Sequence, residues 1–426
     1  MRLWEKGGAL DAEVAAFTVG DDPVLDLAWA RYDVVGSAAH VRVLRAAGLL
    51  DASETKALIG GLKALLEEME RGEFSIAAAE EDVHTAIEAR LTERLGAVAG
   101  RIHTGRSRND QVLTALRLWM LDELDAIEVE WHALATAWLR FAAAHENLPL
   151  AGYTHLQPAM PSSYGLWSAG YAAALLDSLP LLHAARALVD RCPLGTAAGY
   201  GTPLPLDRDL AARLLGFATV ESPVTTAQLS RGLVEAAVLG ALGTATGLVA
   251  RWAWDLVIFS SGEFSLVRLL SAFTTGSSIM PQKRNPDVAE LLRASAVGVR
   301  AARREIEDLV ALPGGYQRDM QLTKGPLLRG VRQARASMRI AAHLASAIEA
   351  TPRPLDPSLF AAADAYRRDK PFREAYREVA AEIAAGTFAP EPSPPPGWDV
   401  AALESRLGGL TPPGSRWRAW AELLNE

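Results

Sequence analysis

The segment from residue 106 to residue 148 contains neither glycine nor proline. Its apolar residues, among them Leu113, Leu116 and Met120, recur three and four positions apart, which is the period of one helix face. If roughly 35 of these residues are helical, the helix is roughly 50 Å long, because each residue adds 1.5 Å. A helix of this length cannot bury its apolar stripe alone, so other long helices must lie beside it.

Four further segments have the length and apolar content of long helices. They are 162–191, 223–260, 287–311 and 326–350. Pro180 should introduce a kink in the first of them, and the second opens with an N-cap serine followed by a proline. Little alternating β pattern lies between them. We therefore predict an all-α fold built on a central bundle of five long helices.

A chain of 426 residues is longer than one core usually supports, so we expect more than one domain. We predict a small N-terminal helical domain over 1–103, the long-helix bundle over 104–350 and a small C-terminal helical domain over 351–426. The shorter helices are expected at 33–48, 52–70, 81–95, around 356–385 and 399–407, with a proline-rich surface connector at 390–397.

Charge and cysteine content limit the possible partners and the compartment. The formal net charge of −8 argues against a nucleic-acid binder, whose surface should be basic. The apolar stretch 247–259 is interrupted by Arg251 and Asp255 and is too short to span a bilayer. The single cysteine, Cys192, allows no intramolecular disulfide. We expect a cytoplasmic protein with no membrane partner and no nucleic-acid partner.

Polar side chains gather directly before the longest helix, in "HTGRSRNDQV" at 103–112. A helix N-terminus presents unpaired N–H groups and the positive end of the helix dipole. Arg106 and Arg108, followed by Asn109, would add to it a cradle for a carboxylate or a phosphate. The alternative is a solvated capping segment with Ser107 or Asn109 as the N-cap, which explains one or two residues but not the cluster.

Two histidines, His155 and His84, are candidates for a functional role. In "GYTHLQPAMP" at 152–161, His155 lies between Thr154 and Gln157, and a loop histidine is a possible acid or base because its reference pKa is near neutrality. His84 lies off the apolar stripe of a short helix. Taken alone, a solvated or structural role explains His84 better than a functional one.

The loop "GSSIMPQKRNPD" at 276–287 carries the densest set of polar groups. The N–H groups around Ser277 could form an anion-binding nest, since the preceding glycine gives the backbone freedom. Lys283 supplies a charge and Asn285 a donor for a carboxylate. Glu290 follows in the first turn of the next helix.

Several more specific catalytic and binding motifs are absent from the sequence. The loop has neither the spacing of a P-loop nor that of the S-x-x-K acyl-transfer motif, and "GTAAGYG" at 195–201 does not follow a strand. There is no HExxH or clustered acidic metal site. Anion-binding cations, amides, a histidine and a loop serine indicate acid–base elimination on a polycarboxylate, with no metal and no cofactor.

Taken together, these segments resemble the fumarase/aspartase superfamily, and within it the argininosuccinate lyase family. The loop at 276–287 is similar to the superfamily signature, and 103–112 with "YTHLQ" narrows the resemblance. Further similarity runs along most of the chain, at "YDVVGSAAHVRVLRAAGLL" (32–50), "EEDVHTAIEARL" (80–91), "PLGTAAGYGTPLPLDR" (193–208), "YQRDMQLTK" (316–324) and "DKPFREAYREV" (369–379).

The resemblance implies a fold and an activity. Members of the family are homotetramers whose long helices form a common core and whose active sites are shared between subunits. They cleave argininosuccinate reversibly into arginine and fumarate by β-elimination of a C–N bond, the last step of arginine biosynthesis. Two alternatives remain open: another fumarate-releasing lyase, acting on adenylosuccinate or aspartate, and a non-catalytic relative of the lens crystallins.

The resemblance also implies roles for individual residues. Ser277 would be the base that takes the succinyl proton, and His155, with Glu290, would serve or orient the acid side, although the opposite assignment stays open. The remaining residues would bind substrate. Lys283 and Asn285 would stabilise the developing carboxylate charge; the succinyl end would meet Arg108, Asn109, Thr154 and Gln157, the arginine half would meet Tyr316, Gln321 and Lys324, and His84 would support the site.

Four positions depart from the family pattern. Met160 stands where glutamine is frequent, Arg284 where lysine is usual, and Thr323 where an acidic residue often precedes the lysine. Asp22 occupies a position that is often serine. These departures leave the reaction type unchanged and bear on the contacts to the arginine half.

Overall fold

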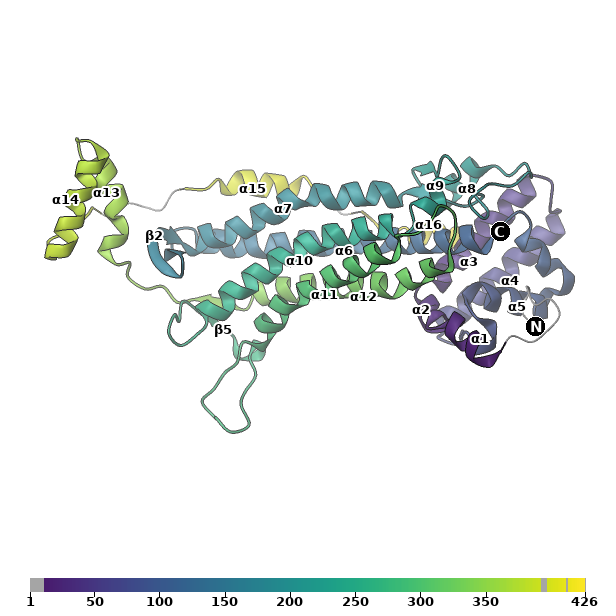
Figure 1. Ribbon diagram of the computed structural model, residues 1–426, viewed down its shortest axis with the longest axis horizontal. Coiled ribbons are helices and arrows are strands. Elements are labelled where there is room, and N and C mark those ends of the chain that lie inside the picture. Colours follow the sequence, from purple (N-terminus) through teal and green to yellow (C-terminus); the bar gives the residue numbers. More distant parts are fainter. Residues whose placement is uncertain (1–10, 392–396, 411–412, 426) are drawn as a thin grey trace.

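The computed structural model describes residues 11–391, 397–410 and 413–425, and Figure 1 shows an elongated molecule built around a bundle of long helices. The five predicted long helices are confirmed as α6 (Arg108–Ala144), α7 (Tyr164–Val189), α10 (Leu233–Phe259), α11 (Asp287–Leu309) and α12 (Lys324–Ala345). α6 packs against α7 and α12, while α10 packs against α7, α11 and α12. The prediction of an all-α bundle is therefore confirmed.

The longest helix begins where its sequence offers a cap. The Ser107 side chain accepts from the N–H of Asn109 at 3.2 Å, and the Asp110 carboxylate accepts from the N–H of Ser107 at 3.0 Å. These reciprocal bonds form a capping box, which satisfies N–H groups that have no partner within the helix. The helix then runs for 37 residues, and its first turn is fixed at one end of the bundle.

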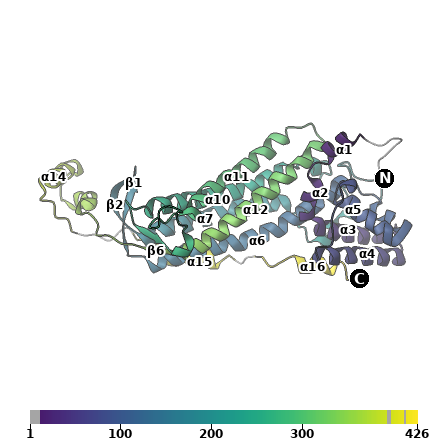
Figure 2. The same ribbon diagram turned by 90° about the horizontal axis from the view of Figure 1, so that it is seen from below.

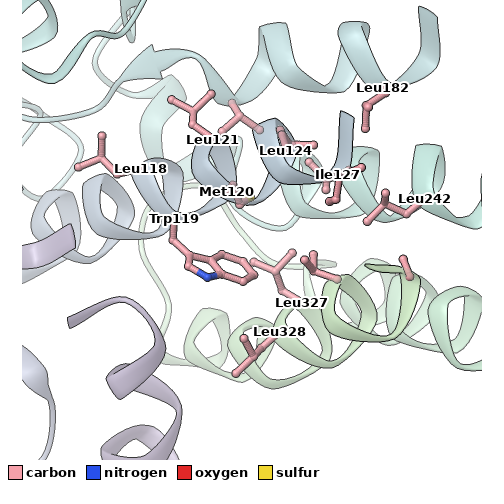
Figure 3. Close-up of a cluster of buried hydrophobic side chains, with 14 of the residues drawn as sticks. Leu118, Trp119, Met120, Leu121, Leu124, Ile127, Leu182, Leu242, Leu327 and Leu328 are labelled. Atoms are coloured by element: carbon pink, nitrogen blue, oxygen red, sulfur yellow. The ribbon is translucent and has the colours of Figure 1, made fainter. Parts of the chain in front are cut away.

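The core lies along the bundle axis. Figure 3 shows Trp119 of α6 pointing toward Leu327 and Leu328 of α12, and all three side chains are buried. Farther along α6, the indole N–H of Trp131 donates to the Leu175 carbonyl of α7 at 3.0 Å. Burying each large apolar side chain contributes about 1.5–3 kcal/mol, so these contacts hold the long helices side by side.

One predicted helix start is wrong. The long helix expected from residue 223 begins at Leu233 instead. The preceding stretch contains a cis peptide bond between Ser222 and Pro223 and the short helix α9 (Thr226–Leu229). Gly232 then has a φ of 79°, which is not helical, and donates its N–H to the Glu235 carboxylate at 2.6 Å. The chain therefore turns before the helix can start.

The N-terminal helices pack around the start of α6, at the right of Figure 1. The predicted helices are confirmed as α3 (Ala30–Ala46), α4 (Ala52–Glu70) and α5 (Val83–Leu95), and they are joined by α1 (Ala12–Val19), α2 (Asp22–Leu25) and α8 (Arg208–Leu215). The distant helix α16 (Trp417–Glu422) also lies here. Trp420 packs edge-on against Tyr32 and donates to the Leu215 carbonyl at 2.8 Å.

The C-terminal segment is distributed along the molecule. α13 (Ala361–Arg367) and α14 (Phe372–Ala385) lie at the far end of the bundle, while α15 (Val400–Gly408) packs along α6 and α7 (Figure 1). The division of the chain at residues 103 and 350 stays a prediction. Most of the connector expected at 390–397 lies outside the described residues.

Short strands occur only in pairs among the described residues. β1 (Pro149–Thr154) and β2 (Gln157–Ser163) form an antiparallel hairpin, β3 (Arg191–Cys192) pairs in parallel with β4 (Thr219–Val220), and β5 (Val267–Leu269) pairs with β6 (Ile348–Ala350). The last pair corrects the helix predicted for 326–350, because that helix ends at Ala345 and the chain then joins β5. Figure 2 shows the hairpin at the end of the bundle opposite α3–α5.

Two helices of the bundle, α7 and α10, are long and apolar enough to cross a membrane by length and composition. The apolar stretch 247–259, judged too short from the sequence, is the second half of the 27-residue α10. In α10, 67% of the most apolar window is buried against other parts of the chain, and the core helix of a globular protein has the same composition.

Candidate active site

His155 lies at the exposed tip of the β1–β2 hairpin. Thr154 pairs with Gln157, which leaves His155 and Leu156 as a two-residue turn with φ values of 54° and 57°. Positive φ at both central positions is what a type I′ hairpin turn requires, and it is unfavourable for residues with a Cβ. The turn therefore leaves His155 exposed at the tip of the hairpin, at a backbone cost.

The loop at 276–287 is closed at its base and open at its tip. Thr275 and Asn285 exchange backbone hydrogen bonds of 3.1 and 2.9 Å, and the Asn285 side chain donates to the Gly276 carbonyl at 3.4 Å. The loop extends away from the bundle between β5 and α11 (Figure 1). Lys283 at its tip is exposed, as is Glu290 in the first turn of α11.

Ser277 is held in a local turn within this loop. Its Oγ accepts the backbone N–H groups of Met280 at 3.2 Å and Ile279 at 3.4 Å. Donors directed at a hydroxyl oxygen stabilise negative charge on it. The anion-binding nest predicted around the serines thus has its N–H groups directed at the serine oxygen itself.

Arg108, in the first turn of α6, reaches the N-terminal end of α5. Its Nη2 donates to Thr85 Oγ1 at 2.9 Å, and its Nε lies 3.3 Å from Asp82 and its Nη1 3.6 Å from Glu81. Asn109 beside it is half-buried. The guanidinium is therefore oriented by acidic neighbours while about a third of the side chain stays exposed.

His84 and Asp33 form a buried ion pair in the same region through Nδ1 and Oδ2. Burial lowers the pKa of His84, but the Asp33 carboxylate outweighs it, and the net pKa is raised. Burial raises the pKa of Asp33, yet His84 and Arg106 bring it below its ordinary value. Gln111 donates to the other Asp33 oxygen at 2.9 Å. The structure thus places His84 in a rigid polar network rather than in solvent.

Lys324 is also buried, at 3% exposure of its side chain. Its Nζ lies 2.7 Å from Asp26 and 3.1 Å from Asp22. Burial lowers the pKa of Lys324, but the two carboxylates outweigh it and raise the pKa above its ordinary value. Burial raises the pKa of Asp22 despite the lysine. The ammonium group is already paired, with Asp22 on its more exposed side.

Tyr316 and Gln321 precede Lys324 and lie at the same end of the bundle. Gln321 donates its amide to the Thr18 carbonyl of α1 at 3.0 Å, and Tyr316 is half-buried. Arg318, between them, pairs with Glu81 at 2.7 Å, the same carboxylate group that approaches Arg108. The chain thus brings the predicted arginine-binding residues together with the start of α6.

The predicted site residues fall into three groups within one chain. The first group surrounds the start of α6, the second lies on the hairpin that follows its end, and the third lies on the loop at 276–287 and the start of α11. The 37 residues of α6 separate the first two groups by roughly 55 Å. A single chain therefore does not bring Arg108 and His155 to one substrate.

The positions that depart from the family pattern have individual surroundings. Asp22 adds a second carboxylate to Lys324, while Thr323 is buried and donates to the Met320 carbonyl at 2.7 Å. The family pattern often places an acidic residue directly before the lysine. Here that position is Thr323, and Asp22 supplies a carboxylate to Lys324 from another part of the chain. Met160 is exposed on β2, and Arg284 lines a surface cavity of about 460 Å³ at the base of the loop.

Sequence reasoning missed Asp33 and Asp26 as the partners of His84 and Lys324. Both carboxylates are buried, and both stand in apolar surroundings in the sequence, where an acidic residue usually needs a partner. That signal could have marked them, although not their partners. Among the described residues, no group of three His, Cys, Asp or Glu side chains could hold a metal ion.

Comparisons with known proteins identify the family. A family model described as "Lyase" matches residues 7–301. Argininosuccinate lyase of Sorangium cellulosum is 48% identical over 392 residues, covering 90% of this chain and 91% of that protein. The chain belongs to the argininosuccinate lyase family. The argininosuccinate lyase of Xylella fastidiosa is 45% identical over 401 residues, covering 92% of this chain and 90% of that protein.

Solved structures agree with membership of the argininosuccinate lyase family at the level of the fold. EDDS lyase in complex with formate superposes with a TM-score of 0.76 at 23% identity, covering 98% of this chain and 85% of that one. A fumarate lyase:delta crystallin from Brucella melitensis gives 0.73 at 18% identity, covering 98% and 95%. The predicted fumarase/aspartase-like fold is confirmed.

Proposed function

We propose that the protein cleaves argininosuccinate reversibly into L-arginine and fumarate, the last step of arginine biosynthesis. The observation that carries this proposal is the 48% identity to an argininosuccinate lyase across nine tenths of the chain. The residue chemistry agrees with it, since the three groups supply a serine oxygen, a histidine and several cations for a substrate with multiple carboxylates.

The reaction breaks the bond between the guanidino nitrogen and the succinyl carbon. Ser277 removes a proton from the neighbouring succinyl carbon, and the electron pair forms the double bond of fumarate as the C–N bond breaks. The N–H groups of Ile279 and Met280 support negative charge on the serine oxygen. Lys283 stabilises the carboxylate charge that develops as the proton leaves.

The departing nitrogen takes one proton as the C–N bond breaks, so that the guanidinium of the substrate leaves as the guanidinium of arginine. We assign this acid role to the His155 side, with Glu290 as its partner. Thr154 and Gln157 flank the histidine on the hairpin and hold the succinyl end together with Asn285, Arg108 and Asn109. Tyr316, Gln321 and Lys324 form the region for the arginine half, and His84 supports the site.

The assembly that completes the site is a homotetramer. The start of α6 and the hairpin lie at opposite ends of that helix within one chain, so each site takes its groups from different copies. The exposed faces of α10 and α11 carry apolar side chains that another copy could cover, namely Leu233, Trp254, Leu291 and Val297. We propose the cytoplasm as the compartment, since the single cysteine is buried and unpaired.

The test is a direct assay. Purified protein is mixed with argininosuccinate in the presence of a chelator, and fumarate is followed by its ultraviolet absorbance while arginine is measured separately. Equal amounts of fumarate and arginine are expected. A correctly assembled protein that releases fumarate from adenylosuccinate or aspartate, and not from argininosuccinate, would overturn the substrate assignment.

A further inference from the structure

Arg231 lies just before α10 with only 3% of its surface exposed. Its guanidinium carbon lies 5.5 Å from the centre of the Tyr316 ring, and its Nη2 donates to the Met320 carbonyl over 3.4 Å. Its Nε has no hydrogen-bond partner among the described residues. A buried cation is thus held by one long hydrogen bond to a neutral acceptor and by an aromatic face.

Arg231 also has no carboxylate in an ion pair with it anywhere in the part of the chain that the structure describes. Glu235, one turn along, accepts the Gly232 N–H with one oxygen, and its other oxygen has no hydrogen-bond partner within the described part of the chain. The equally buried Arg117, by contrast, pairs with Glu221. A buried charge without a counter-charge is strongly unfavourable, so a ligand of opposite charge is expected beside Arg231.

Further unpartnered polar groups lie in the same region. Neither amide atom of Gln228 has a hydrogen-bond partner among the described residues, although its side chain is buried. Its backbone carbonyl accepts the Arg231 N–H at 3.4 Å, and its side chain lies against Gly199, where an added Cβ would come within 2.8 Å of the glutamine Cγ. Thr196 lies with Gly199 in the glycine-rich loop at 195–201, and its buried hydroxyl has no hydrogen-bond partner among the residues that the structure describes.

The glycine-rich loop at 195–201 also contacts the Tyr316 segment. The Tyr200 hydroxyl lies 3.2 Å from the position that a Cβ on Gly315 would take, and Leu229 of α9 approaches Gly314. These contacts bring the loop, α9 and the segment before Lys324 together near Arg231 and Gln228. A buried guanidinium and an unpartnered amide suit a compact anion.

We propose that Arg231, with the Gln228 amide, binds a small monovalent anion in a buried site beside Tyr316. The anion has the chemistry of a halide or a carboxylate, and it comes either from solution or from the substrate. The site is distinct from the residues assigned to proton transfer, and it stands whether or not argininosuccinate is the substrate. Bound anion would neutralise Arg231 and fix Tyr316.

The experiment compares melting temperatures in chloride, formate and gluconate at equal ionic strength. The wild type is expected to melt a few degrees higher in chloride or formate than in bulky gluconate, because a ligand that binds only the folded state stabilises it. Arg231→Met should lose this difference, and in gluconate it should be at least as stable as the wild type. Arg117→Met, which breaks a buried pair, should be destabilised in every salt.

A wild type that responds no more than Arg231→Met to the choice of anion would overturn the site. Gln228→Leu offers a second test with a smaller perturbation, and it should reduce the response to formate. A full response in that variant would remove the glutamine from the site.

Kinetics distinguish the two sources of the anion. If the ligand is a substrate carboxylate, formate should raise the KM for argininosuccinate in the wild type and not in Arg231→Met. If the ligand is a free anion, formate should leave the KM unchanged while it raises the melting temperature. The melting experiment needs no turnover, so failure of the proposed activity and failure of the anion site give different results.

Discussion

The loop at 276–287 and the group of residues around the start of α6, which includes Lys324 at the start of α12, carry similar side chains in opposite surroundings. Lys283 is exposed at the tip of a loop that extends away from the bundle, whereas Lys324 is buried between two carboxylates. In the sequence both are lysines next to polar motifs. The difference teaches that one region is preorganised within the chain, while the other, in the assembly that we propose, becomes part of a site only where it meets another copy.

The largest effect on activity is expected in the loop. Ser277→Ala should lower kcat by roughly 10²–10⁴-fold, the range for removal of a general base, and it should leave the melting temperature unchanged because the loop has few packing contacts. The matched control is Ser278→Ala, at the exposed neighbouring position. Wild-type turnover by the Ser277 variant would remove Ser277 from the base role.

The largest effect on stability is expected at the other end. Lys324→Met leaves Asp26 and Asp22 without their cation and should cost about 3–5 kcal/mol, as is usual when one partner of a buried pair is removed. Lys283→Met, in the exposed loop, should lower activity and leave the free energy of unfolding unchanged. Urea unfolding of both variants checks this, and equal stability losses would contradict the contrast between the two regions.

The pH dependence of stability should come from the buried region. The pKa of His84 is raised above its ordinary 6.5 in the folded state, so its contribution is fully present below pH 6.5 and is lost as the pH rises through the folded pKa. A tenfold difference between the proton affinities of the folded and unfolded states corresponds to about 1.4 kcal/mol. Unfolding measured across this range should show the loss in the wild type.

His84→Gln should flatten that pH dependence above pH 6.5, since it has no imidazolium to lose. His183→Gln, at an exposed position beside Glu128, serves as the control and should keep the wild-type profile. The same slope in wild type and His84→Gln would show that the His84–Asp33 pair does not carry the effect.

A smaller effect is expected at Arg108. Lysine in its place keeps the charge but replaces the fork that reaches Thr85, Asp82 and Glu81 with a point charge. Arg108→Lys should raise KM several-fold with a smaller change in kcat, and steady-state kinetics measure both. Arg101→Lys, at an exposed position nearby, should change neither, and an unchanged KM in the Arg108 variant would leave that residue a structural role only.

The long helices could be predicted from the sequence because their signals are local. Apolar residues at helical spacing and an absence of glycine and proline located α6, and Ser107 marked its start. The start of α10 could not be predicted in the same way. Proline is typical of the first turn of a helix, so Pro223 predicts a helix start there. Gly232 adopts a non-helical φ, and the helix begins at Leu233. Gly232 lies against Val310, a contact that the sequence does not show.

The sequence offered residue types for the candidate site and not their surroundings. Polar loop segments marked His155 and Ser277, while Lys324 came from the resemblance to the family. Burial is a property of the fold, so the pairing of Lys324 with Asp22 and Asp26 was not visible. Arg231 carried no sequence signal, because its isolation from carboxylates exists only in three dimensions.

The most direct test of the central claim uses two inactive variants. Ser277→Ala and His155→Asn are co-expressed with different tags, and assemblies that contain both chains are purified and assayed for fumarate release. If the serine and the histidine of one site come from different chains, some sites in the hybrid carry neither substitution, and the hybrid should regain a substantial part of the wild-type activity. A hybrid no more active than the two variants alone would contradict the account, because every site would then contain one of the defects.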